Sequence, residues 1–189
     1  HIYQSLMNSP FTCDYFKDAD HLDLYFQLPL YFKYNGVDCK GLLDLVIVDH
    51  MNEKIYPIDI KTMGDYTINF PYSLRKRRYD FQAAFYTQGL INSNFNKWCY
   101  DIEDFKFIVE STINPGTPLV FTCTNELLLK KGKFGIPDKK VGDILIKGCK
   151  GFHQAVEIYK WHLKNGFEVD RIVSINEGNL LLGIEGIIE

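Results

Sequence analysis

The stretch CKGLLDLVIVDHMNEKIYPIDIKT, residues 39–62, decides the fold. Two runs of apolar and β-branched residues flank the polar residues 50–53, so the stretch predicts an antiparallel hairpin with a short loop. In that hairpin Asp49 lies opposite Lys54. Because the numbers of directly opposed antiparallel residues have a constant sum, Asp44 then lies opposite Asp59.

These two aspartates are charged residues inside apolar strands, and Lys61 is a third. Directly opposed side chains have Cβ atoms about 4.5–5.5 Å apart, so two carboxylates there repel each other unless a cation lies between them. Lys61 shares a strand face with Asp59 and supplies part of that positive charge. A hard divalent cation, Mg²⁺ or Mn²⁺, would supply the rest. The alternative is that each aspartate faces solvent, but three charges together on neighbouring apolar strands favour the metal site.

The rest of the chain predicts a sheet with flanking helices. A short helix within residues 1–18 should end near Ser9-Pro10, and a strand should run from His21 to the turn signal Asn35-Gly36. Further along we expect a helix over residues 74–91, strands over 104–111 and 117–124, a long helix over 141–164 and a last hairpin in 171–186. This order of strands and helices is typical of the α/β and α+β classes.

The expected helix over residues 74–91 carries one polar stripe, formed at steps of three and four residues by Arg75, Arg78, Gln82 and Tyr86. Near its start stands the basic run RKRR, which comprises Arg75, Lys76, Arg77 and Arg78. Cations are unfavourable at a helix N-terminus, so we interpret this run as a binding site for DNA phosphates, with a solvated helix start as the alternative. A second basic run, KKGKFGIPDKK over residues 130–140, is interpreted as a solvated loop rather than a DNA contact.

Length and composition limit the possible classes. The chain has 189 residues, 46% of them hydrophobic and 24% charged, which predicts a single globular domain over residues 1–189. Its net charge of −3 argues against coating nucleic acid with the whole surface. The five cysteines are scattered without a CxxC pair, which favours a reducing cytoplasm over a disulfide framework or a zinc site. No membrane-spanning run or signal peptide is visible, and the start at His1 suggests a missing upstream segment.

Three motifs follow one another on the expected strand, strand and helix. They are GLLD at residues 41–44, PIDIKT at residues 57–62 and QAAFY at residues 82–86. This order resembles the PD-(D/E)xK nuclease superfamily, and within it the RecB-like and RecE-like, phage-type exonuclease branch. The resemblance implies a restriction-endonuclease-like core, with a central mixed β-sheet flanked by helices. It also implies a Mg²⁺-dependent DNA exonuclease that hydrolyses phosphodiester bonds in phage or prophage recombination or DNA repair. It also implies a ring-shaped homo-oligomer and a recombination annealing protein as partner.

The resemblance assigns roles to individual residues. Asp44 and Asp59 would be metal ligands, with the backbone carbonyl of Ile60 as a third. Lys61 would orient the attacking water. Two helix residues, Gln82 and Tyr86, would contact the substrate near the scissile phosphate.

Two departures from the family pattern leave alternatives open. The family often has a glutamate on the strand before GxxD, where this chain has Gln27, and no residue is assigned to the family's upstream histidine. A nuclease-like module that binds DNA without cutting it is therefore one alternative. A restriction-type or structure-specific endonuclease is the other, and circular DNA separates it from an exonuclease.

Overall fold

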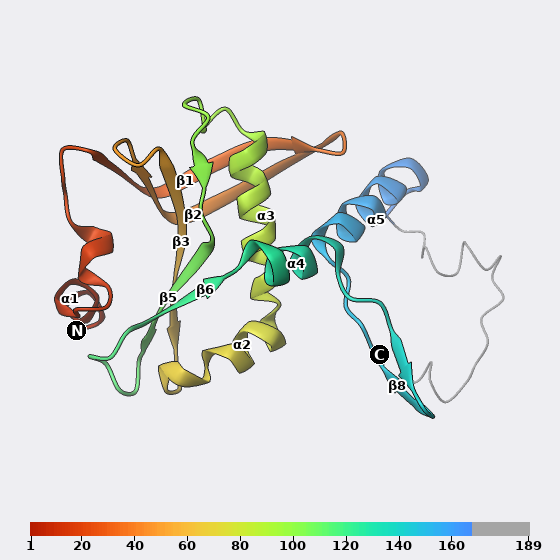
Figure 1. The fold of residues 1–189 in the computed structure, drawn as a ribbon. Helices are drawn as coiled ribbons and strands as arrows, with labels where there is room; N and C mark the ends of the chain where they lie inside the picture. Colours follow the sequence, from red (N-terminus) through yellow and green to blue (C-terminus); the bar gives the residue numbers. More distant parts are fainter. Residues whose placement is uncertain (168–189) are drawn as a thin grey trace.

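The computed structural model describes residues 1–167, and its centre is a mixed β-sheet (Figure 1). The strands of this sheet are β1 (Leu22–Tyr34), β2 (Val37–Asp49), β3 (Lys54–Met63), β4 (Asp101–Ile102), β5 (Phe105–Ser111) and β6 (Leu119–Cys123). The strand order is β1-β2-β3-β5-β6, with β4 also on β3. Strands β3 and β5 are parallel, whereas β1–β2, β2–β3 and β5–β6 are antiparallel. The predicted central mixed sheet is confirmed.

The helices lie on both faces of this sheet. They are α1 (Ile2–Asn8), η1 (Cys13–Phe16), η2 (Thr67–Asn69), α2 (Phe70–Arg77), α3 (Tyr79–Asn92), the π-helical turn η3 (Asn125–Leu129), α4 (Lys130–Phe134) and α5 (Phe152–Asn165). Helix α3 packs through Ala83, Ala84 and Leu90 into the larger hydrophobic core. On the opposite face, Leu6 of α1 packs against Leu45 and other residues of the smaller core. None of the helices within residues 1–167 has the length and apolar character needed to cross a membrane.

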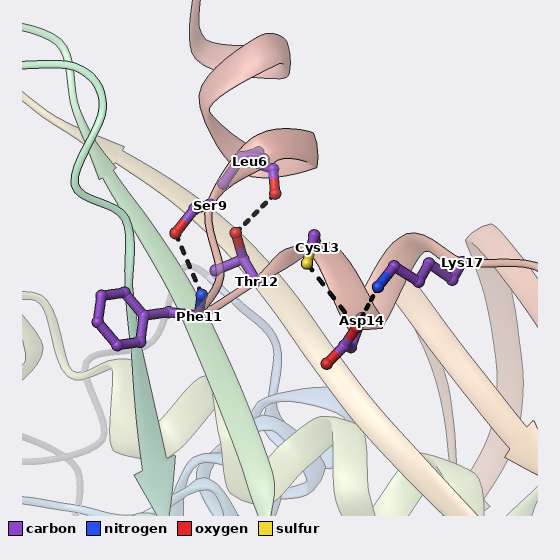
Figure 2. A network of polar contacts seen from close by, with 7 residues as sticks. All are labelled: Leu6, Ser9, Phe11, Thr12, Cys13, Asp14 and Lys17. Atoms are coloured by element: carbon purple, nitrogen blue, oxygen red, sulfur yellow. Dashed lines mark hydrogen bonds and ion pairs between the residues drawn. The ribbon is translucent and has the colours of Figure 1, made fainter.

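Short-range polar contacts within residues 6–17 shape the N-terminal segment (Figure 2). Helix α1 ends before Ser9, which is extended (ψ 134°), as expected for a residue preceding a proline. The buried hydroxyl of Thr12 donates to the carbonyl of Leu6 at 2.6 Å, which turns the chain back after the helix. The predicted short helix that stops near Ser9-Pro10 is thus confirmed.

The decisive hairpin has the predicted register. Strands β2 and β3 pair from Asp49 opposite Lys54 to Leu45 opposite Ile58, around a loop at residues 50–53. The expected strands over 104–111 and 117–124 are observed as β5 and β6. Strands β2, β3 and β5 each bury side chains in both cores, as expected for apolar runs at the centre of a sheet that is covered on both faces.

The predicted single helix over residues 74–91 is wrong. The chain forms two helices, α2 and α3, that meet at Arg78, whose backbone is left-handed (φ 55°, ψ 45°). Asp80 is fully buried and accepts two hydrogen bonds from the Arg78 guanidinium, at 3.0 and 3.1 Å. This bidentate ion pair, and a third hydrogen bond from Arg78 to the carbonyl of Lys150, stabilise a conformation that costs a non-glycine residue free energy.

The helix break at Arg78 also changes the interpretation of the basic run RKRR, residues 75–78. Arg75, Lys76 and Arg77 form the last turn of α2, where cations interact favourably with the helix dipole. The inference that the run needs an anionic partner because it begins a helix is therefore wrong. Arg75 is also not on a common helical stripe with Gln82, since Arg78 separates the two helices.

The predicted long helix over residues 141–164 is wrong in its first half. Residues 139–146 form a hairpin of β7 (Lys139–Val141) and β8 (Ile144–Ile146), and α5 begins only at Phe152. Gly142 stands in the turn with a positive φ of 61°, a conformation that glycine adopts at little cost. The hairpin expected in residues 171–186 lies outside the described residues.

Candidate active site

The central sheet is distorted where the GLLD motif crosses it. The β1–β2 ladder runs through Phe26–Leu45 and Leu28–Leu43, but the rung between them, Gln27–Asp44, is not formed. Gln27 has a positive φ of 51°, which costs a non-glycine residue about 1 kcal/mol or more and often marks functional sites. The β2–β3 ladder ends at the pair Leu45–Ile58, so the predicted direct pairing of Asp44 with Asp59 is not formed. Asp44 stands where both ladders are interrupted.

Two donors hold the carboxylate of Asp44 in this gap. The side-chain amide of Gln27 donates to Oδ1 at 2.9 Å, and the backbone N–H of Ile60 donates to Oδ2 at 2.9 Å. The second bond joins β2 to β3 directly beyond the last rung of their ladder. Asp44 is therefore fixed beside Asp59, the residue that precedes Ile60 in β3.

Asp59 is the most deeply buried charged group of the site. Its side chain is 3% exposed; Oδ1 accepts a hydrogen bond from Gln82 of α3 at 2.9 Å, and Oδ2 lies 2.7 Å from Nζ of Lys61. Burial raises the pKa of Asp59 from 3.8 to about 6. Lys61 and Gln82 lower this pKa, whereas the neighbouring charge of Asp44 raises it further. The contacts of Asp59 thus compensate its charge only in part.

The same carboxylate has an oxygen without a hydrogen bond. Oδ2 of Asp59 is buried and close to Lys61, yet the geometry of that ion pair is not that of a hydrogen bond. Buried polar atoms without such a bond are rare in proteins. An oxygen of this kind beside a second carboxylate fits a hard divalent cation, and the carbonyl of Ile60 is the predicted third donor.

A cation bound at this site would have two acidic side chains as ligands, those of Asp44 and Asp59. No group of three or more His, Cys, Asp or Glu residues is placed to hold a metal within residues 1–167. Mg²⁺ is commonly held by one or two carboxylates, with water and substrate phosphate completing its octahedron. The pair of Asp44 and Asp59 matches that pattern for a single ion.

A cavity of about 340 Å³ adjoins Lys61. Its lining residues come from the end of β3, the loop after it, and α2 with the start of α3: Lys61, Thr62, Met63, Gly64, Asp65, Phe70, Ser73, Arg77 and Tyr79. The Lys61 ammonium lies 4.7 Å from the centroid of the Tyr79 ring, a cation–π contact that holds it at the cavity wall. Ser73 and Tyr79 were not predicted, because Ser73 lies just before the expected helix over residues 74–91 and Tyr79 lies inside it without a distinguishing motif.

The predicted substrate contacts Gln82 and Tyr86 both lie on α3, but they do different things. Gln82 reaches Asp59, whereas the ring of Tyr86 packs against Gly41 of the GLLD motif. A Cβ at Gly41 would lie 2.8 Å from Cε1 of Tyr86, so this glycine makes room for the ring.

The four predicted DNA-binding cations have separate positions. Arg77 lines the cavity beside Lys61, and Arg75 and Lys76 are exposed on the last turn of α2. Arg78 is the partner of buried Asp80. The structure therefore brings one of the four, Arg77, next to the catalytic lysine candidate.

Comparison with known proteins shows the fold. No protein-family model matches the chain, and no curated protein matches it. A crystal structure of a protein from Eubacterium rectale, named "Putative exonuclease", aligns with 99% of this chain at a TM-score of 0.54 and 13% sequence identity. The chain spans 63% of the length of that protein. The two proteins share a fold of mixed sheet and flanking helices, consistent with the predicted restriction-endonuclease-like core.

Proposed function

We propose that this protein is a Mg²⁺- or Mn²⁺-dependent exonuclease that hydrolyses phosphodiester bonds of DNA. The observation that carries the proposal is the buried carboxylate of Asp59, which lies beside Asp44 and forms an ion pair with Lys61 at 2.7 Å. Its likeness in fold to the Eubacterium rectale protein supports a nuclease. The motif resemblance supports the finer assignment to a RecE-like enzyme of phage recombination or DNA repair, cytoplasmic and ring-forming, with an annealing protein as partner.

The residues of the site divide the work of hydrolysis. Asp44, Asp59 and the Ile60 carbonyl would hold the cation, which acidifies water and polarises a phosphoryl oxygen. Lys61, 2.7 Å from Asp59, would hold the attacking water and stabilise the negative charge of the transition state.

The remaining polar residues orient the site and bind substrate. Gln27 and the Ile60 amide orient Asp44, and Gln82 orients Asp59. Arg77, which lines the cavity next to Lys61, is suited to bind a second phosphate of the same strand through its guanidinium.

A cleavage assay with matched variants tests the proposal. Linear duplex DNA should be degraded with Mg²⁺ but not with EDTA, and Lys61→Ala should lower the rate by about 100-fold or more. The control Lys33→Ala removes an exposed lysine of β1 and should leave the rate unchanged. Lys61→Ala activity equal to that of the parent would contradict the role of this lysine. Nicking of covalently closed circular DNA would show that the enzyme is an endonuclease rather than an exonuclease.

A second function, DNA binding without cleavage, is favoured by Gln27. This residue places a neutral amide on Asp44, where the related nucleases often have a third carboxylate. Filter binding in EDTA, compared with cleavage in Mg²⁺ and in Mn²⁺, separates the two functions. Retention of DNA without cleavage in either metal would establish the binding module.

A further inference from the structure

The β7–β8 hairpin lacks a packing partner within the described residues. Each of its six strand residues is exposed, and Ile144 reaches 70% exposure. Figure 1 shows the hairpin projecting away from the sheet, in the same lower half of the view as α2. A two-stranded hairpin with no partner is marginally stable in water, so its exposed apolar residues indicate a surface that binds something.

The base of the hairpin is nevertheless well defined. Ile136 and Cys149 exchange two backbone hydrogen bonds of 2.8 Å, and Asp138 accepts a bond from the Gly148 amide at 2.7 Å. A Cβ on Gly148 would overlap the carbonyl of Ile136, and one on Gly151 would overlap the backbone of Lys133. These close backbone contacts fix the direction in which the hairpin leaves the body of the protein.

The base is also tied to the candidate active site. Arg78 Nη1 donates to the carbonyl of Lys150 at 2.8 Å, directly after the hairpin. Arg78 immediately precedes α3, the helix that carries Gln82, and it follows Arg77 of the cavity wall. The hairpin is therefore anchored at the junction between α2 and α3.

Charge identifies the kind of partner. Residues 130–150 hold seven lysines and two aspartates, so this segment has a charge of +5 in a chain whose net charge is −3. Within the hairpin, Lys139 stands opposite Ile146 and Lys140 opposite Leu145, and Lys147 follows β8. A second copy of the chain docked symmetrically would bring these lysines against one another. A polyanion with apolar groups is the complementary partner.

We propose that the β7–β8 hairpin is a DNA-binding arm that lies in the major groove of duplex DNA next to the cleavage site. The major groove admits a two-stranded β-ribbon, and the lysines would contact the flanking phosphates. The exposed Val141, Ile144 and Ile146, which share one face of the hairpin, would contact thymine methyl groups and other apolar base edges. The proposal deepens the proposed function and rests on it for the choice of DNA.

Equilibrium binding in EDTA tests the arm without cleavage. The variant Lys139→Gln/Lys140→Gln/Lys147→Gln should bind blunt duplex DNA about tenfold or more weakly. Its plot of log affinity against log salt should lose about 2 to 3 units of slope, since each phosphate contact contributes about 0.9. The control Lys17→Gln/Lys33→Gln/Lys160→Gln removes three exposed lysines elsewhere and should bind as the parent does. Equal affinity and slope in the parent and the hairpin variant would overturn the proposal.

Two further measurements distinguish a failure of the DNA-binding arm from a change in oligomeric state and from a failure of the proposed nuclease function. Ile144→Ser/Ile146→Ser, at exposed positions, should keep the melting temperature and the salt slope while weakening duplex binding. If either hairpin variant changes the oligomeric state and leaves DNA binding intact, the partner is a second copy and the proposal is wrong. Hydrolysis of thymidine 5′-p-nitrophenyl phosphate, which lacks a duplex, should be unaffected by these substitutions. If the hairpin variants lose duplex binding while the parent binds duplex DNA but hydrolyses neither substrate, the arm is kept and the nuclease is refuted.

Discussion

The β2–β3 hairpin and the α2–α3 junction lie side by side around Lys61, yet they are encoded in different ways. The hairpin depends on contacts between residues close in sequence, and its pairing from Asp49–Lys54 to Leu45–Ile58 follows from apolar alternation around a short loop. The junction depends on Arg78, whose guanidinium binds Asp80 and the carbonyl of Lys150, 72 residues away. Local patterns therefore define the acidic half of the site, which holds Asp44 and Asp59. Distant contacts define the basic half, which is the α2–α3 junction with Arg77 and Arg78.

The largest expected effect comes from breaking the junction. Arg78→Ala leaves the fully buried Asp80 without its ion-pair partner, so it should lower the free energy of unfolding by about 3–5 kcal/mol. The neighbouring Arg77→Ala should change stability little, since Arg77 is exposed, and should weaken DNA binding instead. Urea unfolding of both variants checks this. Similar losses of stability in the two variants would show that the ion pair between Arg78 and Asp80 does not account for the effect.

The next effect concerns the acidic half and depends on pH. The pKa of Asp59 is raised from 3.8 to about 6, so its protonated form is the one that the fold favours. This stabilisation is fully present below pH 3.8 and is lost as the pH rises through 6, at a cost on the order of 3 kcal/mol. In metal-free protein, Asp59→Asn should therefore raise the melting temperature at about pH 8 and have less effect at about pH 4.

Calorimetry of the metal-free parent and variant across this pH range provides the measurement, and Mg²⁺ should raise the melting temperature of the parent only. Asp38→Asn, an exposed aspartate of β2, is the matched control and should show neither effect. A destabilised Asp59→Asn at about pH 8 would show that the Lys61 contact outweighs burial.

The smallest effect concerns Gln27, whose pair with Asp44 is missing from the β1–β2 ladder. Gln27→Glu would place a third carboxylate beside Asp44, where the amide now donates at 2.9 Å. We expect Mn²⁺ to bind about tenfold more tightly, because groups in contact with metal ligands commonly change affinity by about 10- to 100-fold. Titration followed by electron paramagnetic resonance measures this affinity without turnover. Weaker or unchanged binding would mean that position 27 serves only to orient Asp44.

The sequence predicted the register of the hairpin and the neighbourhood of Asp44 and Asp59, because alternation and loop length specify these locally. The mixed character of the sheet followed from the family resemblance. The sequence also placed Gln82 within reach of the acidic strands, and the structure shows its bond to Asp59. The break at Arg78 was missed because neither glycine nor proline marks it and one of the contacts that stabilise it is with the distant carbonyl of Lys150. The β7–β8 hairpin was missed because its apolar residues suit a helix equally well and lack a core to face.

The hydrogen bond from Arg78 to Lys150 has a consequence for the order of folding during synthesis. All three motifs are complete once residue 86 has left the ribosome. The helix that presents Gln82 to Asp59 obtains the last anchor of its N-terminal end only when residue 150 emerges. A nascent or truncated chain that stops short of this residue would hold the two aspartates in a hairpin but lack the final anchor of the α2–α3 junction. Maturation of the site is therefore delayed until residue 150 has been translated.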